Sequence, residues 1–161
     1  MSFLHRWALR RRLRSALGRG ERVPLESAAR LWALSPLIYI GPVGAGARLL
    51  PECRLYQSFV ESKDIGDHQV EELLSHRSAV VAGYGFEILL ARRSSTTPAA
   101  VEKLRGRQEQ VAMGLGCIVF YQPLGQYVEA RFKAELGAAP NGGPAAPPGN
   151  SDALKGPPSV S

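Results

Sequence analysis

Apolar side chains recur at every second position between residues 80 and 90, which is the clearest periodic pattern in the chain. The positions are Val80, Ala82, Tyr84, Phe86, Ile88 and Leu90. In an extended backbone, successive side chains lie on opposite faces. The pattern therefore predicts a β-strand with its larger apolar residues in the core and Glu87 directed elsewhere. Gly83 and Gly85 predict a bulge or bend within this strand.

Three shorter segments also predict strands. They cover residues 37–43, 54–60 and 117–121. The first run leads into a glycine-rich stretch and the last is wholly apolar, as expected for short buried strands.

Five segments have the features of helices. They cover residues 2–17, 24–34, 67–76, a segment beginning at Thr97, and 124–136. Proline suits the first turn of a helix and glycine the position after its end, which fits Pro24 and Gly137. Within the segment that begins at Thr97, one helical stripe would contain Val101, Leu104, Val111 and Leu115. The sequence thus predicts an α+β or small α/β fold in a single domain, with three to four short strands and three to five helices.

Composition divides the chain into three parts. Residues 137–161 contain eleven Gly or Pro among 25 residues and few large apolar side chains. Such a segment cannot offset its ordering entropy by burial, so we expect a disordered Pro/Gly-rich tail. Residues 21–136 are expected to form the folded α/β-type domain, and residues 1–20 a basic N-terminal arm or targeting segment.

All of the net charge lies in this arm. The chain has 20 Lys and Arg against 14 Asp and Glu, and six arginines precede the first acid, Glu21. The remainder is neutral, with 14 basic and 14 acidic residues. A charge block at one end acts as an address or a contact, so these side chains are the candidate binding residues. They are Arg6, Arg10, Arg11, Arg12, Arg14 and Arg19.

The arm supports two functional hypotheses. An acid-free, Arg-rich helix is typical of a mitochondrial transit peptide, although its leucines and arginines share one arc of the helix. The same arginines could bind the phosphates of nucleic acid or be read as a nuclear or nucleolar signal. We therefore expect an anionic partner, namely an import receptor, a membrane surface or nucleic acid, together with a protein partner. A solvated basic terminus that reflects GC-rich coding is the third alternative.

The rest of the sequence contains few features of a membrane-spanning, catalytic or metal-binding segment. Residues 31–47 are uncharged, but Pro36 and Pro42 make a stable transmembrane span a poor interpretation. No Ser-His-Asp arrangement occurs. His68, Glu72 and His76 recur every four residues, but a helix would place them on its solvent face, so we interpret them as an ordinary polar surface. We therefore predict no catalytic residues, no metal and no cofactor.

These observations favour a non-enzymatic accessory or interaction protein, such as an organelle accessory or assembly factor in the mitochondrion. The alternative is a nucleic-acid-binding regulatory protein of the nucleus or nucleolus, of the kind found among viral accessory proteins. A small enzyme is the third hypothesis.

Overall fold

The structure, a computed structural model, describes residues 3–43, 49–116 and 118–137. The predicted tail beyond Gly137 and the glycine-rich stretch after Val43 lie outside these residues. Within them, seven helices and a three-stranded sheet form one α+β fold, which confirms the predicted fold class. The elements are α1 (Phe3–Gly18), α2 (Leu25–Ala33), β1 (Leu37–Val43), α3 (Pro51–Glu61), α4 (Asp67–Leu74), α5 (Ala79–Ala91), α6 (Thr97–Leu104), β2 (Gln110–Gly116), β3 (Ile118–Pro123) and α7 (Leu124–Gly137).

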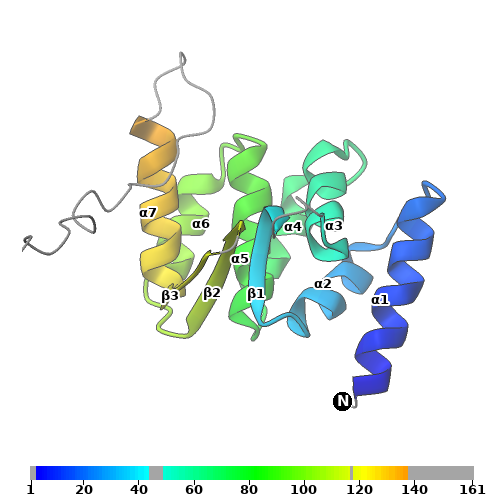
Figure 1. Cartoon of the computed structure of the whole chain (residues 1–161). Helices are drawn as coiled ribbons and strands as arrows, with labels where there is room; N and C mark the ends of the chain where they lie inside the picture. Colours follow the sequence, from blue (N-terminus) through cyan, green and yellow to red (C-terminus); the bar gives the residue numbers. More distant parts are fainter. Residues whose placement is uncertain (1–2, 44–48, 117, 138–161) are drawn as a thin grey trace, which may run out of the picture.

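The sheet is mixed and has the strand order β1-β2-β3. Strands β1 and β2 are parallel, with Leu37 opposite Ala112, whereas β2 and β3 are antiparallel in an uninterrupted register. In Figure 1 the sheet crosses α5, with α7 beside β3 and helices α1 to α3 toward the β1 side. The core lies between the sheet and the helices behind it.

The segment predicted as the clearest strand is helix α5, so that prediction was wrong. Every residue from Ala79 to Leu90 is buried, because the sheet covers one side of this helix and α4 another. A helix buried all round has no polar face, so its 3.6-residue period cannot be recognised in the sequence. The apolar residues predicted for the core are indeed buried, but Glu87 is buried with them.

The two glycines of α5 serve close packing rather than a bulge. A Cβ atom at Gly83 would lie 2.4 Å from Cδ1 of Ile38 in β1. A Cβ atom at Gly85 would lie 2.9 Å from Cβ of Leu73 in α4. Glycine at these positions lets the sheet and α4 approach α5 from its two sides.

Two further segments differ from their predictions. Residues 54–60 belong to helix α3 because Leu55, Tyr56 and Phe59 form a buried helical stripe after Pro51 in the first turn. The helix that begins at Thr97 ends at Leu104, and Val111 lies in β2 instead. Pairing with both β1 and β3 makes β2 the central strand, and these ladders outweigh the helical stripe seen in the sequence.

Candidate functional site

Helix α1 carries five of the six arginines predicted as binding residues, and its apolar stripe packs on the domain. Leu13 is only 5% exposed and belongs to the core cluster. Leu9, Ala16 and Leu17 are half-buried beside it. The leucines that recur every four residues therefore face α2 and α3, which fixes the opposite face of α1 toward solvent.

Arg10 lies at the edge of this packed face and binds a buried acid. Its Nη2 donates to Oε1 of Glu52 in α3 at 2.5 Å. Glu52 is 1% exposed. Two buried polar atoms of the pair, Nε of Arg10 and Oε2 of Glu52, have no hydrogen-bond partner among the described residues. Arg10 is thus used within the fold, and the pair is only partly satisfied.

The opposite face of α1 is basic and exposed. Arg11, Arg12 and Arg14 are exposed and form no ion pair within residues 3–43, 49–116 and 118–137. The guanidinium carbon of Arg11 lies 5.3 Å from the ring centroid of Trp7, a cation–π distance. The Trp7 side chain is itself exposed. We call Trp7, Arg11, Arg12 and Arg14 the basic face.

The remaining two candidate arginines do not join the basic face. Arg19 follows the end of α1 and forms an ion pair with Glu21, which raises the pKa of Arg19 and lowers that of the carboxyl group. Arg6 lies in α1, but its side chain is outside the part that the structure describes.

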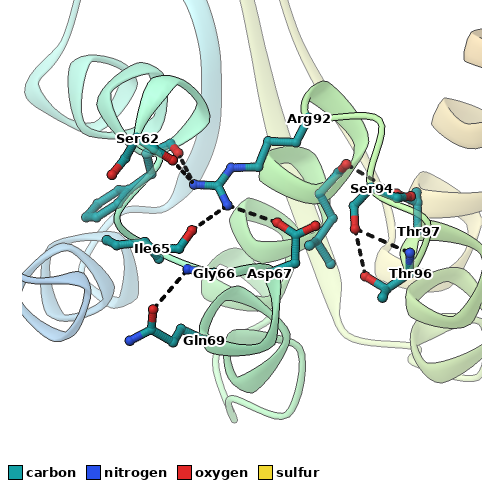
Figure 2. A network of polar contacts seen from close by, with 11 residues as sticks. Ser62, Ile65, Gly66, Asp67, Gln69, Arg92, Ser94, Thr96 and Thr97 are labelled. Atoms are coloured by element: carbon teal, nitrogen blue, oxygen red, sulfur yellow. Dashed lines mark hydrogen bonds and ion pairs between the residues drawn. The ribbon is translucent and has the colours of Figure 1, made fainter.

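Most of the described arginines outside α1 form hydrogen bonds or ion pairs within the fold. Arg92, which follows α5, donates through Nη1 to the Ile65 carbonyl at 2.8 Å and to Asp67 Oδ1 at 2.9 Å. Its Nη2 donates to the Ser62 carbonyl at 2.9 Å and to the Phe59 carbonyl. Figure 2 shows this guanidinium between the loop after α3 and the start of α4. Arg92 therefore joins three helices and is not available to a partner.

A second buried carboxylate was missed in the sequence. Glu87 in α5 accepts a hydrogen bond from the Tyr127 hydroxyl and two from Arg131, at 2.9 and 3.1 Å. Burial, and then the Glu87 charge, raise the pKa of Tyr127 well above its usual value. Contact with Glu87 raises the pKa of Arg131. The cluster fastens α7 to α5 through these three hydrogen bonds.

Other features that could support chemistry are sparse in the described residues. No group of three or more His, Cys, Asp or Glu side chains could hold a metal ion there. A shallow hollow of about 270 Å³ lies between the end of α1 and α3, but Glu21 and Arg22 at its rim pair with Arg19 and Asp64. None of the described helices is long and apolar enough to cross a membrane.

No known protein family, curated protein or solved structure matches this chain. The basic face of α1 is the most distinctive charged feature on the described surface of the molecule.

Proposed function

We propose that this chain is a non-enzymatic accessory protein that binds an anionic partner through the basic face of α1. One observation carries the proposal. Arg11, Arg12 and Arg14 project from a helix whose apolar stripe is already packed on the domain, and no described acid neutralises them. Guanidinium groups on a helix that is packed on a domain bind phosphate or carboxylate oxygens with less entropic cost than those of a disordered tail do.

The packing of α1 supports an arm that acts while it is attached to the domain. Removing α1 would uncover the apolar surface that Leu13 covers. It would also remove Arg10, the cation that pairs with the Glu52 carboxylate. We therefore propose that the arm is retained after delivery, with the mitochondrion as the proposed location and the nucleus or nucleolus as the alternative.

Nucleic acid is the second candidate partner, and the pairing of Trp7 with Arg11 is the observation that favours it. Arginine binds phosphate in a bidentate manner, and an exposed indole can stack on an unpaired base. A membrane surface uses the same arginines, but insertion of an amphipathic helix would need an apolar stripe, and that of α1 is occupied.

A charge-matched pair of variants tests the proposal. The first replaces Arg11, Arg12 and Arg14 by Gln. The control replaces Arg54, Arg77 and Arg93 by Gln, since these exposed arginines lie outside α1 and also form no ion pair among the described residues. Both variants have the same net charge, so only the position of the lost charges differs.

Binding is measured to single-stranded and double-stranded nucleic acid and to vesicles with anionic lipids, across a range of salt concentrations. We expect the basic-face variant to lose binding and the control to retain it. For duplex DNA, the slope of log K against log salt should change by about 0.9 for each lost phosphate contact. Equal loss in both variants would mean that only net charge matters and would refute a site on α1.

A further inference from the structure

Strand β3 exposes four consecutive apolar residues at an edge of the sheet. The exposed fractions are 58% for Ile118, 43% for Val119, 45% for Phe120 and 74% for Tyr121. Within the described residues, β3 pairs only with β2, and Figure 1 shows it as the outer strand. Soluble proteins usually protect such an edge with charge, a bulge or a covering segment. No charged residue lies between Glu109 and Glu129, so charge does not protect this one.

The direction of the free backbone groups of β3 follows from its register. The Leu124 N–H donates to the Glu109 carbonyl at 3.0 Å, which continues the β2–β3 ladder by one pair. Hydrogen-bonded pairs alternate with non-hydrogen-bonded pairs in an antiparallel ladder. Ile118, Phe120 and Gln122 therefore bond toward β2. The backbone groups of Val119 and Tyr121 point to the open edge, and so does Pro123, which lacks an N–H.

We propose that β3 pairs antiparallel with β3 of a second copy of this chain, around a twofold axis at Phe120. In this register Val119 of one copy and Tyr121 of the other exchange N–H to carbonyl hydrogen bonds, and the symmetric pair does the same. Val119 and Tyr121 also form a β-branched–aromatic cross-strand pair, which favours antiparallel pairing. The two sheets become one continuous sheet of six strands.

Charge and backbone chemistry favour a second copy as the occupant. Two identical strands brought together would repel each other if they carried like charges, and β3 carries none. The position of Pro123 selects the register. An axis at Tyr121 would place the Val119 carbonyl opposite a residue without an N–H, and an axis at Val119 would place Tyr121 opposite residue 117, beyond the strand. Only the axis at Phe120 satisfies every outward group of Val119 and Tyr121 within β3.

Disulfide trapping tests this register in the full-length protein. In a Cys117→Ser background, Phe120→Cys should form a covalent dimer under mild oxidation, because a non-hydrogen-bonded pair on the axis has its Cα atoms about 4.5 Å apart. Gln122→Cys is the matched control. It faces Ile118 of the other copy, and the two Gln122 positions would be about 13 Å apart at about 3.3 Å per residue. Cys53 is buried and should not react.

A second measurement does not depend on cysteine chemistry. The amide hydrogens of Val119 and Tyr121 should exchange several-fold more slowly as protein concentration rises, whereas that of Phe120, already bonded to β2, should not change. Tyr121→Lys should make the protein monomeric in sedimentation experiments, and Gln126→Lys on the exposed surface of α7 should not. A protein that stays monomeric at high micromolar concentration, or that cross-links equally at positions 120 and 122, would overturn the proposal.

Discussion

Two buried carboxylates hold the first and last described helices, α1 and α7, on the fold. One of them accepts more hydrogen bonds than the other. Glu52 and Glu87 are each 1% exposed, and each pairs with an arginine from a helix near one end of the chain. Glu87 accepts hydrogen bonds from Nε and Nη2 of Arg131 and from the Tyr127 hydroxyl. Glu52 receives one donor from Arg10, and its second oxygen has no partner among the described residues.

The difference indicates which helix is held more firmly. Burying a carboxylate costs several kcal/mol, and only good geometry with further hydrogen bonds offsets that cost. The Glu87 cluster meets this condition, whereas the Arg10–Glu52 pair meets it only in part. Helix α1 is therefore attached mainly by its leucine stripe, and α7 by both apolar packing and a complete polar cluster.

The largest expected effect comes from breaking the complete cluster. Arg131→Met should lower the free energy of unfolding by about 3–5 kcal/mol, because it leaves the Glu87 charge buried with only the tyrosine hydroxyl. Urea unfolding measures this effect. Lys133→Met, on the exposed side of the same helix, should change stability by less than about 0.5 kcal/mol.

Adding Glu87→Gln to the Arg131→Met variant should recover part of the loss, because a neutral amide needs no cation. A small effect of Arg131→Met, similar to that of Lys133→Met, would show that the cluster does not hold α7 and would remove the contrast between the two helices.

An intermediate effect is expected at the incomplete pair. Arg10→Met should cost about 1–3 kcal/mol, less than Arg131→Met, because Arg10 donates one hydrogen bond to its carboxylate whereas Arg131 donates two. Arg14→Met is the control on the same helix and should be nearly neutral. If Arg10→Met destabilises the protein more than Arg131→Met does, the order of attachment proposed for α1 and α7 is reversed.

Alkaline pH should destabilise the folded protein through Tyr127, which belongs to the Glu87 cluster. Burial raises its pKa in the folded state above the usual value of about 10, so the folded protein holds this proton more tightly than the unfolded chain. The resulting stability is complete below pH 10 and is lost as pH rises further. Burial raises the pKa of Tyr84 in the same direction. Each tyrosine should contribute about 1 kcal/mol of loss per pH unit above 10.

Tyr127→Phe should reduce this alkaline loss, as measured by urea unfolding at a series of pH values. The comparison with Tyr84→Phe is informative because Tyr84 bonds the backbone of Tyr39 in β1 and lies outside the Glu87 cluster. An unchanged pH dependence in Tyr127→Phe would mean that its hydroxyl is not held within the fold.

Local signals predicted the outer parts of the fold better than its centre. The basic helix, the strand at residues 37–43 and the C-terminal helix lie close to their predicted bounds, because each is covered on one side or ends at Gly or Pro. Helix α5 was predicted as a strand because the sheet and α4 together remove its polar face. That arrangement depends on residues far along the chain, so no short window of sequence contains it.

The candidate site, too, could be predicted from the sequence only in part. The charge block before Glu21 is visible in the sequence, and the structure places most of it on one helix. The sequence could not separate Arg10 from its neighbours, because its partner Glu52 lies 42 residues away and is recognised only when α1 packs on α3. The inward direction of Glu87 depends in the same way on Arg131, 44 residues away.

The smallest effect on stability is expected for the basic face itself. Replacing Arg11, Arg12 and Arg14 by Gln should change the free energy of unfolding by less than about 0.5 kcal/mol, because these side chains are exposed and Gln has nearly the same helix propensity as Arg. Adding Arg10→Gln should then introduce the larger cost of the broken Glu52 pair. The sequence alone treats the four arginines as equivalent, whereas the structure predicts a clear step between the triple and the quadruple variant. Urea unfolding of both, together with anion binding, separates the two roles: the triple variant should lose binding without losing stability. A triple variant as unstable as the quadruple one would show that the whole arm is structural and that α1 has no separate binding face.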